Sequence, residues 1–110
     1  MKVNIADLYP YEDSGISAKI ERQKKKIKTK TAEPIKILAI DNDLLVVDGN
    51  NTAYAAKQLG LTEIEAKEVS RRESEMVPYR DALQKAKDNN LQGYEHWPID
   101  PSLTERAKRY

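Results

Sequence analysis

Residues 46–60, VVDGNNTAYAAKQLG, pass from an apolar run through Asp48-Gly49 and two asparagines straight into an alanine-rich segment that ends at a glycine. The apolar run, residues 44–47, is typical of a strand covered on both faces. The alanines predict a short helix over about residues 51–59 that lies close against a sheet. A helix that follows a strand so closely begins with N–H groups that lack intrahelical acceptors. The small polar residues at this junction either cap the helix or offer those groups to a ligand.

The segments on either side of the junction predict strands. Residues 35–40 and 44–47 are two apolar runs separated by Asp41-Asn42-Asp43, which is the pattern of a β-hairpin. Residues 61–69 alternate apolar and polar positions and predict a further strand. The order strand, strand, helix, strand with short connections predicts an α/β (α+β) fold, in which a small mixed sheet carries packed helices.

A basic segment precedes the hairpin. Residues 8–17 predict a loop, and Ser17 is placed to cap a helix that begins near Ala18. Residues 19–30 then contain seven Lys or Arg residues and one acid, Glu21. This density fits a phosphate-binding or DNA-binding surface centred on Lys24–Lys28. A solvated helix face whose lysine stems cover apolar surface explains the same density, and it is the more common cause of such a run.

The last third of the chain predicts a helical extension over residues 76–110. Pro78 suits the first turn of an amphipathic helix, and Gly93 is the expected stop. The single histidine, His96, has no second histidine and no cysteine with which to bind a metal, so we expect it to pack with its aromatic neighbours Tyr94 and Trp97. Residues 102–105 have the spacing of a capping box for a terminal helical turn.

Length and composition limit the class of protein. A chain of 110 residues is expected to form one domain, residues 1–110, with a modest core. The net charge of +1 argues against a surface that binds polyanions everywhere. The sequence contains no cysteine, which excludes disulfides, thiolate zinc sites and a cysteine nucleophile. Neither a secretory signal nor a membrane span is evident, so a cytoplasmic location is expected.

Residues 34–69 resemble the core of the ParB/sulfiredoxin superfamily. The resemblance rests on an apolar hairpin, an Asp-Gly turn, an Ala-Ala-Lys-x-Leu-Gly helix and a following strand; the matching positions are Asp48, Gly49, Ala55, Ala56, Lys57, Leu59 and Gly60. The upstream segment LYPYE is similar to a segment that precedes the basic helix in several members, including the free-serine kinases of this fold. The resemblance covers roughly half of the chain.

The resemblance implies a nucleotide or phosphate site at the start of the helix. Gly49 would allow close approach of a ligand, and the N–H groups of Asn50, Asn51 and Thr52 would point along the positive end of the helix dipole. The Thr52 hydroxyl would add a donor. Asp48 is a candidate magnesium ligand or a helix cap. The implied ligands are ATP, ADP or CTP with magnesium, with Lys24–Lys28 as nearby cations.

The sequence also departs from the family. Members commonly carry His-His-Arg where this chain has Asn50-Asn51-Thr52, so the arginine that clamps phosphate is missing from the turn. The cysteine that sulfiredoxin chemistry needs is missing as well. We also expect no room in 110 residues for the DNA-reading and dimerisation regions of a complete segregation protein.

Three function classes therefore remain open. The first is a nucleotide-binding domain with weak phosphoryl-transfer or nuclease-like activity, in which Glu12 and Asp48 are the candidate catalytic residues. The second is a DNA-binding or protein-binding module that kept the fold and lost the chemistry. The third is a small-molecule kinase in which Glu12 is the general base, and this class requires a second pocket beside Glu12. A loop glutamate before a basic helix is also a common surface ion partner.

Overall fold

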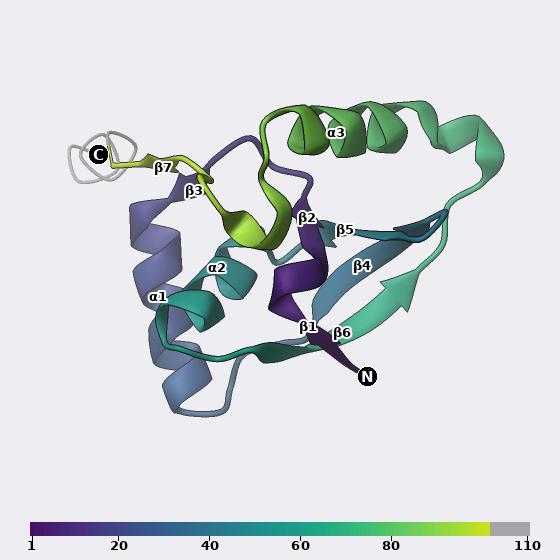
Figure 1. Cartoon of the computed structure of the whole chain (residues 1–110). Helices are drawn as coiled ribbons and strands as arrows, with labels where there is room; N and C mark the ends of the chain where they lie inside the picture. Colours follow the sequence, from purple (N-terminus) through teal and green to yellow (C-terminus); the bar gives the residue numbers. More distant parts are fainter. Residues whose placement is uncertain (102–110) are drawn as a thin grey trace, which may run out of the picture.

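The fold consists of a mixed β-sheet with helices packed on it (Figure 1). The structure is a computed structural model, and it describes residues 1–101. The five-stranded sheet has the order β1 (Lys2–Asn4), β6 (Glu63–Val69), β4 (Ile35–Ile40), β5 (Asp43–Asp48) and β2 (Leu8–Pro10). The pairs β4–β5 and β1–β6 are antiparallel, whereas β4–β6 and β2–β5 are parallel. The predicted hairpin, the following strand and the α+β class are confirmed.

Three α-helices and a small second sheet complete the fold of residues 1–101. The helices are α1 (Ser17–Lys28), α2 (Asn50–Gln58) and α3 (Val77–Asp88), and single 3-10 turns lie at Ile5–Asp7, Glu73–Glu75 and Gln92–Tyr94. Strands β3 (Gly15–Ile16) and β7 (Ile99–Asp100) pair in parallel. Figure 1 shows α1 and α2 side by side at one end of the molecule and α3 across the other end, near β5 and β2.

The core lies on both faces of the sheet because β4 is buried on alternating sides. Ile35 and Ile37 face the cluster that contains the alanines of α2, and Leu38 and Ile40 face a second cluster with Leu83 of α3. Lys36 and Ala39, between them, are exposed. The small side chains of α2 allow this helix to approach the sheet closely, as the alanine pattern predicted.

The segment over residues 8–17 is more ordered than the sequence indicated. It contains β2 and β3, and no side chain of residues 1–101 caps α1. The expected Ser17 cap is therefore wrong. The main-chain N–H of Ile16 instead donates to Oδ1 of Asn51 at 2.9 Å, so a side chain of α2 secures the entry to α1.

The end of α3 also differs from the prediction. The helix ends at Asp88, and the chain turns through Asn90, whose φ is 56°. Gly93 lies beyond the turn with φ of 67°, and a Cβ there would lie 3.1 Å from Cα of Ala6. Gly93 thus permits a close backbone approach and does not terminate the helix.

The aromatic residues after α3 return to the core. Tyr94 and Trp97 are buried in the same cluster as β4 and α2. The predicted packing of His96 with them is wrong, because the His96 side chain is exposed. The capping-box residues 102–105 lie outside the described residues. Within residues 1–101, no helix has both the length and the apolar character needed to cross a bilayer.

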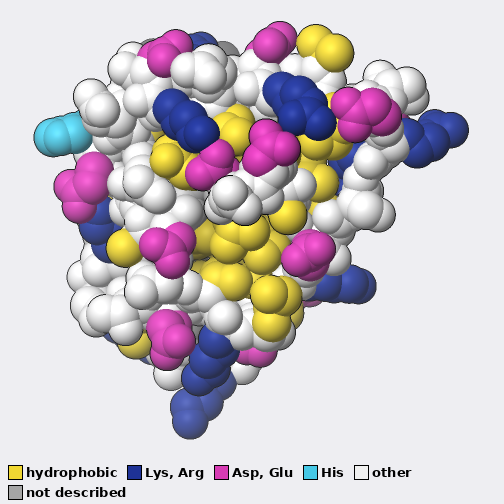
Figure 2. All heavy atoms as spheres, turned by 45° about the vertical axis from the view of Figure 1, so that its right-hand side comes forward, with side chains coloured by type: hydrophobic (Ala, Val, Ile, Leu, Met, Phe, Trp, Pro, Cys, Tyr) yellow, Lys and Arg dark blue, Asp and Glu magenta, His cyan; other side chains and the backbone are white. Residues whose placement is uncertain are grey.

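Figure 2 shows the face that carries the right-hand side of Figure 1. Apolar side chains reach the surface in its centre, and charged side chains of both signs surround them. The candidate site described next lies between α1 and α2, at the other end of the fold.

Candidate functional site

Gly49 makes the sharp turn between β5 and α2. Its φ of 93° lies in the left-handed region, and a Cβ at this position would come within 2.7 Å of Cγ2 of Ile35 and 3.2 Å of its Cα. Both the backbone conformation and the space therefore require glycine. The turn lets α2 begin at Asn50, one residue earlier than predicted, directly above the buried start of β4.

The side chains of Asn50 and Asn51 make hydrogen bonds to other parts of the chain. Asn50 is 3% exposed, its Nδ2 donates to the Val46 carbonyl at 3.0 Å, and its Oδ1 accepts from the Tyr94 hydroxyl at 2.7 Å. Asn51 accepts from Ile16. Their side chains are thus engaged within the protein, and their main-chain N–H groups are what the turn offers to a ligand.

The first turn of α2 presents donors that have no acceptor in the described part of the chain. The first helical hydrogen bond runs from the N–H of Ala53 to the Gly49 carbonyl at 2.9 Å, and no side chain caps the helix. The N–H groups of Asn50, Asn51 and Thr52 therefore receive no acceptor from residues 1–101. Such a helix start, with the positive end of the helix dipole, attracts anions.

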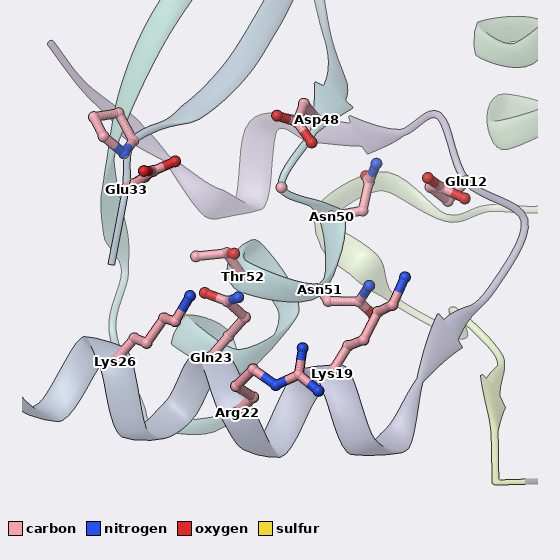
Figure 3. Close-up of a pocket in the computed structure, with 12 residues that line it drawn as sticks. Glu12, Lys19, Arg22, Gln23, Lys26, Glu33, Asp48, Asn50, Asn51 and Thr52 are labelled. Atoms are coloured by element: carbon pink, nitrogen blue, oxygen red, sulfur yellow. The ribbon is translucent and has the colours of Figure 1, made fainter. Parts of the chain in front are cut away.

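Helix α1 faces this turn with a row of polar side chains. Together with the first turn of α2, they line a cavity of about 350 Å³ (Figure 3); the contributing residues of α1 are Lys19, Arg22, Gln23 and Lys26. Within residues 1–101, none of these three cations has a carboxylate within 4.0 Å. Lys24, by contrast, pairs with Glu21 at 2.9 Å and does not line the cavity.

Arg22 and Lys19 line the candidate cavity but lie outside the range on which the sequence prediction centred. The prediction centred on Lys24–Lys28, but of that range only Lys26 lines the cavity. The spacing of positions 19, 22, 23 and 26 places them on one helix face, so the sequence contained this signal. What it did not reveal was which face of α1 turns toward α2.

Carboxylates border the same cavity. Glu12 comes from the segment between β2 and β3, Glu33 precedes β4, and Asp48 ends β5; in Figure 3 they lie around the cavity opposite the cations of α1. Asp48 is exposed, and Oδ2 lies 3.9 Å from Nζ of Lys36. It does not cap α2, so the cap interpretation of Asp48 is wrong. No group of three or more His, Asp or Glu side chains suited to a metal ion occurs in residues 1–101.

A second cavity of about 340 Å³ lies next to Glu12. Its wall includes Tyr11 and Asp13 from the segment after β2, Lys85 from α3, and His96. Asp13 and Lys85 form an ion pair at 3.0 Å. Glu12 lines both cavities, so the structure contains the pocket beside this residue that the kinase hypothesis requires.

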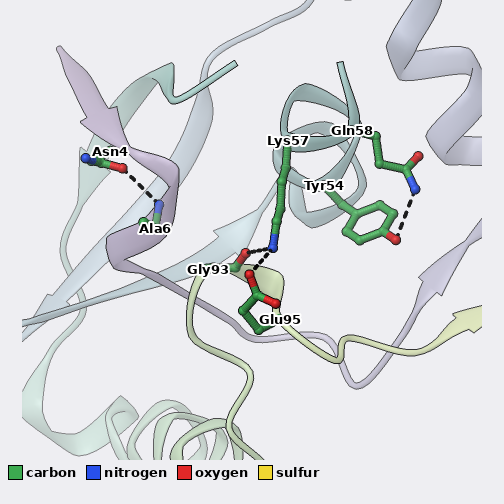
Figure 4. A network of polar contacts seen from close by, with 7 residues as sticks. All are labelled: Asn4, Ala6, Tyr54, Lys57, Gln58, Gly93 and Glu95. Atoms are coloured by element: carbon green, nitrogen blue, oxygen red, sulfur yellow. Dashed lines mark hydrogen bonds and ion pairs between the residues drawn. The ribbon is translucent and has the colours of Figure 1, made fainter. Parts of the chain in front are cut away.

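Lys57 of the Ala-Ala-Lys motif has a structural contact on the far side of α2. Its ammonium donates to the Gly93 carbonyl at 2.8 Å and to Oε1 of Glu95 at 2.9 Å (Figure 4). The hydrogen bond from Lys57 lowers the pKa of the Glu95 carboxyl. Lys57 therefore ties α2 to the segment that follows α3 and does not line the cavity.

Comparison with known proteins places the fold. No protein-family model and no curated protein matches the sequence. Among solved structures, sulfiredoxin from Arabidopsis thaliana superposes with a TM-score of 0.58 at 19% identity, over 76% of this chain and 97% of that chain. ParB from Caulobacter crescentus, C-terminally truncated and complexed with CTP-gamma-S, gives 0.55 at 18%, over 84% of this chain and 52% of that chain.

A third solved structure agrees with these two. Protein Atu1540 from Agrobacterium tumefaciens gives a TM-score of 0.58 at 14% identity, over 76% of this chain and 48% of that chain. The chain therefore has a ParB/sulfiredoxin-like fold, as its residues predicted. It spans about half the length of the ParB and Atu1540 chains.

Proposed function

We propose that this protein binds a nucleotide through its phosphates in the cavity between α1 and the first turn of α2. The observation that carries the proposal is that cations of α1 face N–H groups of α2 across one cavity, and that neither set has a partner within residues 1–101. The fold supports the same proposal, since a ParB neighbour of this fold is complexed with CTP-gamma-S.

Arg22 supports this proposal because the turn itself lacks a cation. The resemblance predicts an arginine at the start of the helix, and this chain has Thr52 there. Arg22 lines the same cavity from the neighbouring helix. A guanidinium there offers the bidentate, charge-assisted hydrogen bonds that phosphate oxygens prefer, so the grip on phosphate is supplied from α1.

The carboxylates favour a metal-bound nucleotide over free phosphate. Glu12, Glu33 and Asp48 would repel a bare anion in the same cavity. Magnesium is usually held by one or two carboxylates together with substrate phosphates, and Asp48 is the exposed carboxylate next to Gly49. We therefore assign magnesium-bound ATP, ADP or CTP as the ligand class, with Asp48 as the metal ligand.

The test is binding of ATP, ADP, CTP and GTP, each with and without magnesium, by calorimetry and thermal unfolding. A ligand that binds only the folded state stabilises it by about 2.7 kcal/mol at a concentration of 100 Kd. Arg22→Gln should weaken binding about tenfold or more, because a hydrogen bond to a charged group contributes about 1.5–3 kcal/mol. Lys25→Gln removes the same charge from the same helix, but Lys25 does not line the cavity.

Equal binding by the Arg22→Gln and Lys25→Gln proteins would show that the cavity is not the site. No binding of any nucleotide at millimolar concentration would refute the proposal. If neutralising Lys24, Lys25 and Lys28 then abolished a salt-sensitive DNA interaction, a DNA-binding module of the same fold would be the better interpretation.

A second candidate function is a small-molecule kinase in which Glu12 is the general base. The observation that favours it is the cavity of about 340 Å³ that shares Glu12 with the proposed nucleotide site. An acceptor bound in this second cavity would lie on one side of Glu12, and the phosphates of a nucleotide in the first cavity would lie on the other side. The test is magnesium-dependent nucleotide turnover, which Glu12→Gln should abolish while nucleotide affinity stays within a few-fold of the wild type. Turnover that survives Glu12→Gln would exclude this role.

A further inference from the structure

Two parts of the lining of the proposed nucleotide cavity, the first turn of α2 and the segment at Glu12, are attached to one aromatic cluster. Tyr94 and Trp97 have ring centroids 5.0 Å apart in an edge-on arrangement, and Tyr54 of α2 lies 6.4 Å from the first and 5.4 Å from the second. Tyr94 and Trp97 are only 2% and 4% exposed. Neither lines the cavity.

Each of the two buried rings sends one hydrogen bond to a different wall. The Tyr94 hydroxyl donates to Oδ1 of Asn50, the first residue of α2, at 2.7 Å. Indole Nε1 of Trp97 donates to the main-chain carbonyl of Glu12 at 2.9 Å. Asn50 and Glu12 lie on different elements of the cavity, and the cluster contacts both.

The bond to Asn50 is well suited to hold a helix start in place. Asn50 uses its amide nitrogen for Val46 of β5 and its amide oxygen for Tyr94, so the residue is fixed from two sides. Because the site is buried, removal of one partner leaves a polar group unsatisfied, which costs more than the bond itself contributes. Among the described residues, no side-chain cap performs this task for α2.

We propose that Tyr94 and Trp97 are positioning residues for the nucleotide cavity: Tyr94 fixes the first turn of α2, and Trp97 fixes the main chain at Glu12. The ligand role of the cavity rests on the proposed function. The positioning itself does not, because it is a property of the free protein and has its own measurement.

The experiment compares Tyr94→Phe with Tyr54→Phe in the full chain. Both variants remove one hydroxyl from the same aromatic cluster and keep the ring. Within residues 1–101, the Tyr54 hydroxyl accepts only from Nε2 of Gln58, an exposed contact at 3.0 Å on the outer side of α2 (Figure 4). Tyr54→Phe is therefore the matched control for the loss of a buried hydroxyl that holds the helix start.

Amide hydrogen exchange in the free protein measures the positioning. The N–H of Ala53 closes the first turn of α2, and the N–H of Leu45 in central strand β5 reports global unfolding. In Tyr94→Phe, exchange at Ala53 should rise about two- to tenfold more than exchange at Leu45, as the loss of one hydrogen bond predicts. In Tyr54→Phe the two amides should keep their wild-type ratio. Equal increases at both amides in Tyr94→Phe would overturn the assignment, because the hydroxyl would then stabilise the whole fold and not the helix start.

Trp97→Phe tests the second wall. The N–H of Tyr11, which donates to the Val46 carbonyl at 3.2 Å, lies beside Glu12 and should exchange faster relative to Leu45 in this variant.

ATP affinity, measured by calorimetry below the unfolding transition, should fall about two- to tenfold in Tyr94→Phe and stay within twofold in Tyr54→Phe. Wild-type affinity in Tyr94→Phe would refute the link to the cavity. If the wild-type protein binds no nucleotide, the proposed function fails, and the exchange ratios alone still decide the positioning.

Discussion

Substitution of Gly49 by alanine tests why the turn before α2 requires glycine. Two costs add at this position. An L-residue in the left-handed region costs about 1–2 kcal/mol. The new methyl would also meet Ile35 at 2.7 Å, and the neighbouring Cα at 3.2 Å belongs to the main chain of a buried strand and cannot move aside easily. Overpacking of this kind costs about 1–3 kcal/mol, so Gly49→Ala should lower the free energy of unfolding by about 2–5 kcal/mol.

Gly60 provides the matched control for the Gly49 substitution. Its φ of 85° carries a similar conformational cost, but a Cβ there would meet nothing within 4 Å. Gly60→Ala should therefore cost only about 1–2 kcal/mol. Urea unfolding of both variants, followed by circular dichroism, gives the difference, which isolates the contact with Ile35. Equal destabilisation of the two proteins would refute the argument that β4 approaches Gly49 too closely for a side chain.

Three further predictions concern the core. Burial, with a smaller contribution from a neighbouring carboxylate, raises the pKa of Tyr94 well above its ordinary value of 10.0. The stability that this shift contributes is complete below about pH 10 and is lost as the pH rises further. The free energy of unfolding should therefore fall less steeply above about pH 10 in Tyr94→Phe than in Tyr54→Phe, which keeps the buried hydroxyl. The Leu45 side chain is fully buried between β5 and α3, so Leu45→Ala should lower the free energy of unfolding by about 2–5 kcal/mol. Val77 is 65% exposed, so Val77→Ala should change it by no more than about 0.5 kcal/mol; denaturant unfolding measures both. Trp97 is the one tryptophan of the chain and is buried, so its emission should lie at short wavelength and shift to longer wavelength in a single transition that coincides with circular dichroism; two separate transitions would contradict a common core.

The sequence predicted the central part of the fold because its signals there are local. The hairpin of residues 35–48 follows from two apolar runs around an Asn/Asp turn, and the helix of residues 50–58 follows from its alanines between two glycines. Each of these patterns acts within a few residues, so it survives without knowledge of the rest of the chain. Strands β2 and β3, each of two or three residues, were missed because pairing with distant strands alone defines them.

In the candidate site, too, the sequence predicted the features that depend on local residues and missed those that depend on long-range packing. Asp48-Gly49 and the helix start were identified from the sequence, because a strand that runs directly into a helix leaves N–H groups unpaired wherever it occurs. The partners of that turn were not identified. Arg22 and Lys19 belong to a helix whose rotation is set by packing, and Lys24 is as basic in sequence as either of them but pairs with Glu21.

The sequence by itself thus determined the central hairpin, the helix after it and the turn that is the candidate site. Only the tertiary structure decided what surrounds the turn. The Asn50 side chain, which suits a ligand contact equally well in sequence, is directed to Tyr94, 44 residues away, and Trp97 reaches Glu12 across 85 residues. Such contacts depend on how buried faces pack together, and no local pattern of residues encodes them.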